Sequence, residues 1–316
     1  MSRKSKLKID TKNKSYSIID SPFYKLFSKK KLATLLKCDL SELKKLRDDE
    51  GNYSEFEDIG KSGKPRKIQK PSRNLDIVHT RIASLLSRIS TPTYLHSGKK
   101  EHSNVTNAKA HLETSALMTT DIRSFFPSTS HRMIFSFFYG VMQCSSDVAE
   151  LLADLCTCHK HLPTGSRISM PLAYWANCRM FEELNSLSSK HGVTMTVYVD
   201  DLTFSGSKVN KLFTSTVNKI ISKHGHTMHP AKTKLYSSHE PKLVTGVVVD
   251  KGVLRVRNEQ HLKLFEDISL WSFIKDEKYA LGSSITSKLI GRLHAMGTIE
   301  PRFKSKAKSV RNSTAM

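Results

Sequence analysis

The stretch TVYVDDLTFSG, residues Thr196 to Gly206, places two adjacent carboxylates, Asp200 and Asp201, between two short runs of apolar and β-branched residues. Such runs predict strands, and the polar pair between them predicts a hairpin with the carboxylates at its tip. An Asp-Asp pair in a turn is most often simply solvated. Here the apolar flanks indicate a rigid, half-buried edge, where two neighbouring negative charges require a positive partner.

A third carboxylate, Asp121, also follows a predicted strand, in the segment ALMTTDIRSFFPS (116–128). The three carboxylates can therefore meet on one sheet. Magnesium prefers oxygen ligands and leaves coordination positions for water and phosphate. Two such ions roughly 3.5–4 Å apart activate an attacking hydroxyl and neutralise a leaving pyrophosphate. An aspartate trio in a basic chain thus predicts a polymerase or a nuclease.

The composition indicates a polyanionic partner. Lys and Arg number 51 against 29 acidic residues in a chain of 316, and the formal charge of +22 is spread over the whole length. A membrane surface is the alternative partner, but no long amphipathic basic helix or lipidation signal accompanies the charge. The start, MSRKSKLKID, lacks the apolar core of a signal peptide, and no apolar run could span a bilayer. We therefore expect a cytoplasmic protein that binds nucleic acid and no membrane.

The five cysteines are odd in number and lack paired metal spacing, which suits a reducing compartment. The run CTCHKHLP (156–163) brings two cysteines and two histidines together. A zinc site is one interpretation of that run. The sequence favours an ordinary apolar segment instead, because no second Cys or His pair follows at finger-like spacing.

Periodicity predicts helices in most of the first 60 residues. The stretch GKSGKPRKIQKPSRNL (60–75) is rich in Gly, Pro, Lys and Arg, a composition typical of a basic hairpin. Helical patterns follow at 131–158 and 169–187, and a second hairpin is predicted in KLVTGVVVDKGVLRV (242–256). From residue 261 the pattern is helical and basic, and the tail FKSKAKSVRNSTAM (303–316) is expected to be disordered.

Taken in order, these motifs resemble those of reverse transcriptases, and most closely the bacterial retron enzymes, over residues 60 to 250. DIRSFFPS is similar to the first catalytic block, LPTGSRISMPLA to the template and nucleotide block, YVDD to the second catalytic block, and HPAKTK to the block with a lysine near the triphosphate. Two further motifs, NAKAH (107–111) and VTG (244–246), match retron signatures.

The resemblance implies an α+β, right-hand polymerase fold with fingers, an antiparallel-sheet palm and a helical thumb. The expected division is a helical N-terminal layer at 1–59, fingers at 60–115, a palm at 116–250 with a fingers insertion at about 128–160, and a thumb with a basic tail at 251–316.

The resemblance also assigns roles at the catalytic centre. Asp121 and Asp200 would be the main ligands of two Mg²⁺ ions, with Asp201 as the supporting catalytic carboxylate. Phe126 would pack under the incoming sugar and leave no room for a 2′-hydroxyl, while Phe125 is expected in the core.

Other matched positions would contact the substrates. Arg66, or Lys67 in the other hairpin register, would reach the triphosphate, whose charge suits a planar guanidinium fork. Gly165 lies in the nucleotide block, and Lys232 would neutralise or protonate the pyrophosphate. Asn107 and His111 are candidates for reading RNA if their segment is helical; the alternative is that they brace the fingers.

The chain departs from the family pattern at several positions. Thr164 replaces the usual Gln of the Pro-Gln-Gly turn, and Ser166–Arg167–Ile168–Ser169 replaces Ala-Pro-Ser-Ser. Val199 stands where retrons more often carry Ala, and Arg123 and Ser124 replace an acidic pair. These changes leave the three aspartates intact.

The function that the resemblance implies is RNA-directed DNA synthesis from deoxynucleoside triphosphates. A retron enzyme would copy a structured noncoding RNA into multicopy single-stranded DNA (msDNA), priming from a 2′-hydroxyl of that RNA, and would act in anti-phage defence with a separate effector protein. The alternatives are another bacterial reverse transcriptase of the group II intron kind and a catalytically idle scaffold that only binds RNA.

Overall fold

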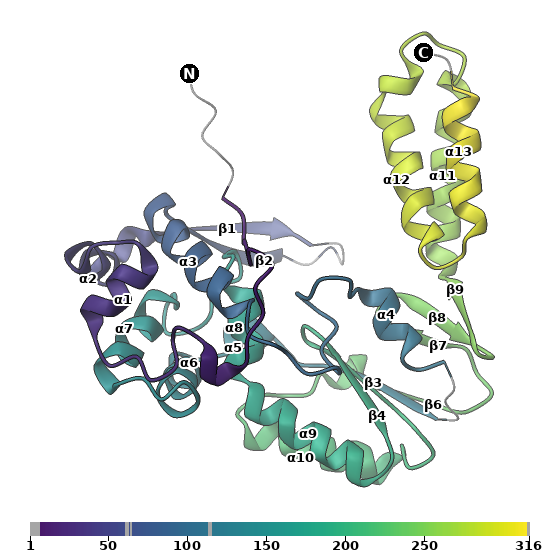
Figure 1. Ribbon diagram of the computed structural model, residues 1–316. Helices are drawn as coiled ribbons and strands as arrows, with labels where there is room; N and C mark the ends of the chain where they lie inside the picture. The colour runs from purple at the N-terminus through teal and green to yellow at the C-terminus, as the bar shows by residue number, and fades with distance from the viewer. Residues whose placement is uncertain (1–6, 61–62, 64, 113–115, 315–316) are drawn as a thin grey trace.

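The computed structural model describes residues 7–60, 63, 65–112 and 116–314. It combines helices with three antiparallel sheets, so the α+β fold class is confirmed (Figure 1). Over the described residues, no helix has both the length and the apolar character needed to cross a membrane.

A four-stranded antiparallel sheet carries the aspartates. Its strands lie in the order β4 (Thr194–Tyr198), β5 (Asp201–Ser205), β3 (Leu117–Asp121) and β6 (Lys234–Tyr236). The side chains of a strand alternate between its two faces. One face of this sheet contributes Met118, Met195 and Phe204 to the main core, together with apolar residues of α9 (Cys178–Lys190) and α10 (Lys211–Lys223). These two helices run beside the sheet in Figure 1.

The other face is covered by a smaller layer. It consists of α4 (Asn104–Lys109) and a three-stranded sheet of β7 (Lys242–Val244), β8 (Val247–Asp250) and β9 (Val253–Val256). The predicted hairpin at 242–256 thus has three strands, because the chain turns twice. Ala108, Leu117, Val244 and Val247 form a separate buried cluster with Val249 between the layers.

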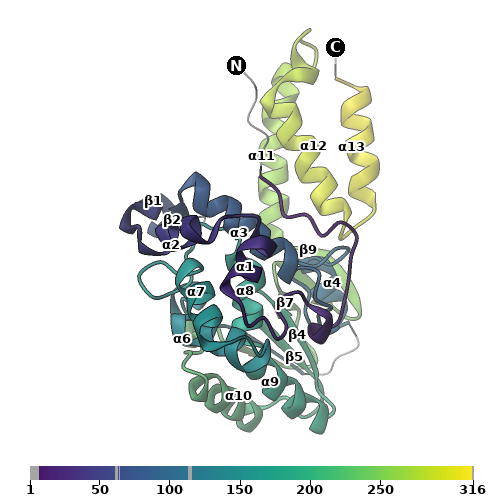
Figure 2. The same cartoon turned by 60° about the vertical axis from the view of Figure 1, so that its left-hand side comes forward.

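The chain up to residue 176 adds a helical layer that shares the main core with the four-stranded sheet (Figure 2). Its helices are α1 (Lys29–Leu36), α2 (Leu40–Asp48), α3 (Arg73–Leu86), α5 (Phe125–Ser128), α6 (His131–Ser136), α7 (Ser146–Leu155) and α8 (Ser169–Ala176), with a π-helical turn at Phe137–Val141. Short 3₁₀ turns lie at Ile18–Asp20, Glu50–Asn52, Pro230–Lys232 and Ala280–Gly282.

The basic hairpin consists of β1 (Tyr53–Ile59) and β2 (Pro65–Pro71), paired antiparallel from Tyr53↔Pro71 to Ile59↔Pro65. Most of its side chains are exposed. The boundary expected between residues 59 and 60 falls at the end of β1. It would place β1 in the N-terminal layer and β2 in the fingers, although the two strands form one hairpin. The paired strands are better kept together, and we propose that the fingers begin near residue 53.

The C-terminal region forms a three-helix bundle of α11 (Asn258–Ile274), α12 (Ser284–Gly297) and α13 (Arg302–Asn312), which stands apart from the sheets in Figures 1 and 2. The prediction of a disordered tail from residue 303 was wrong. Phe303, Ala307 and Val310 are spaced along one face of α13 and are buried against α11 and α12. That apolar stripe orders the helix although lysines occupy its other faces.

Candidate active site

The predicted hairpin is present, and its turn consists of Val199 and Asp200 between the paired residues Tyr198 and Asp201. Val199 has a φ of 63°, a value that favours glycine in two-residue hairpin turns and that a β-branched residue rarely adopts. Two hydrogen bonds hold the turn: the Val199 amide donates to Ser97 Oγ at 3.0 Å, and the Ile122 amide donates to the Asp200 carbonyl at 2.9 Å. The backbone at Asp200 is therefore fixed from both sides.

The three aspartates come together at this turn. Asp121, at the end of β3, is the direct cross-strand partner of Asp201, and its side chain is almost completely buried. Burial, followed by the charge of Asp121, raises the pKa of Asp200. Burial together with the charges of Asp200 and Asp121 raises the pKa of Asp201 to about 7. Crowded negative charges of this kind are what a bound cation would stabilise.

Lys232 supplies positive charge to the trio. It ends the 3₁₀ turn at Pro230–Lys232, and its Nζ lies 2.7 Å from Asp121 Oδ2. The His229 amide donates to the Asp121 carbonyl at 2.8 Å, which ties the same turn to β3. Because the Lys232 side chain is 56% exposed, its ammonium is free to leave Asp121 without disturbing the core.

In the described part of the chain, Asp121, Asp200 and Asp201 are not among the groups of three side chains whose ligand atoms all lie within 4.8 Å of one another.

An open cleft of about 380 Å³ extends from Asp121 and Asp201 along the sheet. Its floor includes Thr119 and its cross-strand partners Thr203 and Lys234. Sequence reasoning missed these residues. The signal that could have found them is the alternation along the strands, which places Thr119 and Asp121 on the same face.

The two phenylalanines after Asp121 lie in different environments. Phe125 is buried and its ring contacts those of Phe181 and His226, so the expectation of a core residue is confirmed. Phe126 is only half-buried at the edge of that core. Its contact with an incoming sugar stays a prediction.

Arg66 and Lys67 are both exposed on β2, and as consecutive strand residues they point to opposite faces of the hairpin. The Nζ of Lys67 is already paired with Glu55 Oε2 at 2.5 Å. Of the two candidates for the triphosphate, Arg66 is therefore the one we propose.

Gly165 and Thr164 attach the nucleotide-block turn to this hairpin. A Cβ on Gly165 would lie 2.7 Å from the backbone oxygen of Gln69, so no other residue fits without a shift. The Thr164 hydroxyl donates to the Lys67 carbonyl at 2.5 Å. This contact gives Thr164 a structural role at the position where the family usually carries Gln, and Arg167 nearby forms an ion pair with Asp76.

The prediction that Asn107 and His111 contact RNA is wrong for this structure, because both side chains are fully buried. His111 follows the end of α4 and hydrogen-bonds Ser205 Oγ at 2.5 Å and Thr196 Oγ1 at 2.7 Å, both on the sheet. Burial lowers the pKa of His111 to about 3, so the ring is neutral. The Asn107 amide nitrogen lies 3.4 Å from Thr245 Oγ1 in the VTG motif. These residues brace the small layer against the sheet, so they have a bracing role, but at a different place from the fingers that the alternative interpretation named.

Comparison with known proteins agrees with the resemblance found in the sequence. The chain is 28% identical over 225 residues to the retron Se72 reverse transcriptase of Salmonella heidelberg, a match covering 66% of this chain and 58% of that protein. It is 24% identical over 209 residues to the retron Ec86 reverse transcriptase of Escherichia coli, covering 65% of each. The chain is therefore similar in sequence to retron reverse transcriptases.

A further retron relative, the Mx65 reverse transcriptase of Myxococcus xanthus, is 26% identical over 234 residues, which is 66% of this chain and 54% of that protein. The match to each of these three relatives thus spans less than two thirds of the relative's own length. No protein-family model matches the chain.

Among solved structures, the chain is similar to a foamy viral protease-reverse transcriptase in complex with double-stranded DNA. The TM-score is 0.42 and the identity 13%, over 84% of this chain and 44% of that one.

Proposed function

We propose that this chain is an RNA-directed DNA polymerase of the retron type. The observation that carries the proposal is the strained Val199–Asp200 turn, which brings Asp200 and Asp201 beside Asp121 at one end of a cleft. The likeness to retron reverse transcriptases supports the choice of polymerase over nuclease.

The aspartates fit a pair of divalent ions, because they offer only oxygen ligands and their crowded charge lacks full compensation. We assign Mg²⁺ to Asp121, Asp200 and Asp201. When bound, such ions would activate a primer hydroxyl and stabilise the leaving pyrophosphate. Lys232 is placed to exchange its contact with Asp121 for one with the pyrophosphate.

The substrates follow from the residues around this centre. Deoxynucleoside triphosphates would be held by Arg66 on the hairpin, with Gly165 keeping the nucleotide-block turn close to β2. The ring of Phe126 would exclude a ribose 2′-hydroxyl. A chain with a net charge of +22 suits an RNA template and its DNA copy. The proposed parts are a helical layer, fingers, palm and thumb, with the four-stranded sheet as the palm.

In the cell, we propose that a dedicated structured noncoding RNA is the template. Its internal 2′-hydroxyl would serve as primer, the product would be msDNA branched to the RNA, and a separate effector protein would complete an anti-phage system. The protein would act in the cytoplasm.

Nucleic acid that copurifies with the protein from cells carrying its native locus tests this function. We expect short single-stranded DNA joined to RNA by an alkali-resistant 2′–5′ branch, which a debranching enzyme releases. The Asp200→Asn variant is the matched control, because it should bind RNA through the unchanged basic surface and yield no DNA. Unlinked DNA would favour a group II intron-like enzyme. DNA synthesis unaffected by Asp200→Asn would rule out the assigned centre, and RNA without DNA from the native protein would favour an idle scaffold.

A further inference from the structure

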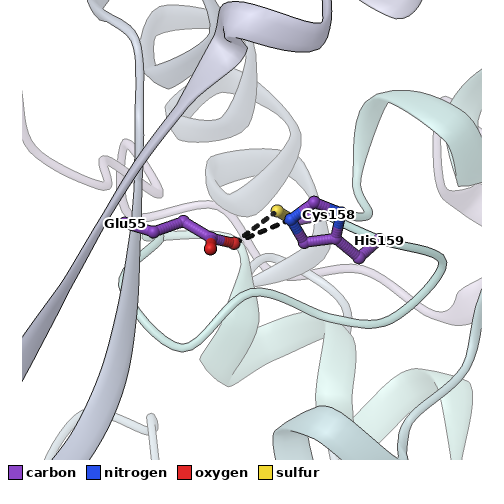
Figure 3. Close-up of side chains that lie close together, drawn as sticks. All are labelled: Glu55, Cys158 and His159. Carbon is purple, nitrogen blue, oxygen red and sulfur yellow. Dashed lines mark hydrogen bonds and ion pairs between the residues drawn. The ribbon is translucent and has the colours of Figure 1, made fainter.

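A second group of metal-ligating side chains lies away from the aspartates, where β1 faces the loop after α7. Figure 3 shows the Glu55 carboxylate pointing toward the sulfur of Cys158 and the ring of His159. Cys158 Sγ lies 3.9 Å from Glu55 Oε1, and His159 Nε2 lies 2.8 Å from the same oxygen. One ligand atom from each residue lies within 4.8 Å of the other two.

We propose that Glu55, Cys158 and His159 form a binding site for one zinc-type divalent ion that fastens the β1–β2 hairpin to the 156–161 loop. A thiolate, an imidazole and a carboxylate are the ligand types that zinc prefers. Zinc bonds of that kind place tetrahedral ligands roughly 3.3–3.8 Å apart. The Cys158–Glu55 separation nearly meets that range, and the His159–Glu55 separation needs to widen by roughly 0.5 Å.

The loop geometry supports this proposal. Cys158 and His161 exchange two backbone hydrogen bonds, of 2.8 and 3.0 Å, around a turn formed by His159 and Lys160. Both turn residues have positive φ, 48° and 61°, in a type of turn that favours Asn and Gly. A strained turn without either residue presents the His159 ring beside Cys158, and such strain concentrates at functional sites.

The carboxylate is already oriented by its neighbours. Lys67 Nζ is paired with Glu55 Oε2, and the Gln69 amide donates to Oε1 at 3.0 Å. An oxygen accepts two partners, so a metal ion can replace the His159 contact at Oε1 while the Gln69 bond remains. Contacts of this kind, which hold a ligand in place, are typical of metal sites.

The site also has room for a fourth ligand. Cys158 is buried, but the group borders a cleft of about 800 Å³ that extends between β1 and the end of α2. Three protein ligands and one water would complete a tetrahedral ion. The sequence alone disfavoured zinc in CTCHKHLP because no second Cys or His pair follows at finger-like spacing. The third ligand proposed here, Glu55, lies on a strand about a hundred residues earlier.

Metal content measured after dialysis against zinc, with excess Mg²⁺ to occupy oxygen-only sites, tests the proposal. We expect one tightly held zinc per native chain, and its loss in Cys158→Ser, His159→Ala and Glu55→Gln. Cobalt substitution should give a thiolate-to-cobalt charge-transfer band that Cys158→Ser abolishes. The controls are Cys38→Ser and His239→Ala, which remove a thiol and an exposed imidazole elsewhere in the chain.

Proteolysis tests whether bound zinc fastens the β1–β2 hairpin to the 156–161 loop. Zinc at ten times its dissociation constant should slow tryptic cleavage after Arg66 by about tenfold in the native protein. The reason is that the hairpin would separate from the loop, and so become open to trypsin, only in the metal-free form. His159→Ala should abolish this protection, and since that side chain is 67% exposed its loss should not unfold the protein. A native protein that binds no zinc, or variants that retain it, would overturn the proposal without affecting the polymerase assignment.

Discussion

At the residue scale, Val199 shows how this chain fixes its clustered carboxylates. A left-handed conformation at a non-glycine residue costs on the order of 1–3 kcal/mol. Hydrogen bonds from Val199 to Ser97 and from Ile122 to Asp200 hold the turn in that conformation. The aspartates were recognisable from sequence because charged residues are rare between apolar strands. The bond to Ser97 was not, because no local pattern predicts a contact across a hundred residues.

Phe126 provides a test of sugar selection. Replacing Phe126 with Ala should raise the ratio of ribonucleotide to deoxynucleotide incorporation about tenfold or more, since overpacking typically costs 1–3 kcal/mol and its relief would admit a 2′-hydroxyl. Single-nucleotide incorporation assays measure this ratio. Phe135→Ala, which removes another half-buried ring, should leave it unchanged. An unchanged ratio in Phe126→Ala would make Phe126 only a packing residue.

His111 predicts a pH dependence of stability. Its pKa is about 3 in the folded protein against roughly 6.5 when unfolded, so the folded state favours the neutral ring. The stabilisation is complete above pH 6.5 and is lost as pH falls toward 3. At pH 5 the loss should be about 2 kcal/mol. His111→Gln cannot titrate, so its free energy of unfolding should fall less between pH 7 and pH 5.

Denaturant unfolding at the two pH values measures this difference. His239→Gln is the matched control, because His239 is exposed and should leave the pH dependence as it is in the native protein. If His111→Gln loses as much stability as the native protein between pH 7 and pH 5, the buried contacts of His111 with Ser205 and Thr196 do not hold a neutral ring.

At the scale of elements, sequence patterns predicted the helices and strands that depend mainly on neighbouring residues. The β4–β5 hairpin and most helices follow from alternation and periodicity. The basic hairpin was expected from its composition at residues 60–75, but its first strand, β1, lies before those residues. Two errors arose where long-range packing decides. The composition of α13 is that of a disordered tail, yet Phe303, Ala307 and Val310 bury it against α11 and α12. The NAKAH motif suggested RNA contacts, yet the three-stranded and four-stranded sheets enclose its polar side chains.

The contact between the β1–β2 hairpin and the nucleotide-block turn was also beyond local patterns. From the sequence, Gly165 looks like an ordinary turn glycine. The structure requires glycine there because a larger side chain would clash with the backbone of Gln69 on β2. Thr164 reads as a departure from the family pattern, but its hydroxyl binds the Lys67 carbonyl. The site therefore depends on two elements that lie far apart in the sequence.

At the scale of the whole molecule, we expect RNA binding to depend on many basic residues rather than on any single contact. The chain carries a net charge of +22, and the C-terminal bundle extends from β9 with its own apolar core. Because α13 is packed rather than free, deleting residues 303–316 would remove part of that core as well as its charges. A test of RNA contact must keep the core residues and change only the exposed charges.

Four exposed basic residues of α13, namely Lys304, Lys306, Lys308 and Arg311, allow that test. Each phosphate contact contributes roughly 0.7–0.9 to the slope of log affinity against log salt, because a condensed counterion is released. Changing all four to Gln should therefore flatten the slope by up to about 3.6 when RNA binding is titrated over salt concentration. A control variant with Gln at Lys12, Lys14, Lys44 and Lys45 has the same net charge and should keep more of the slope, since these exposed residues lie outside the bundle. Equal slopes in the native protein and the α13 variant would mean that RNA does not contact this face of the bundle. Equal flattening in both variants would mean that only the total charge matters.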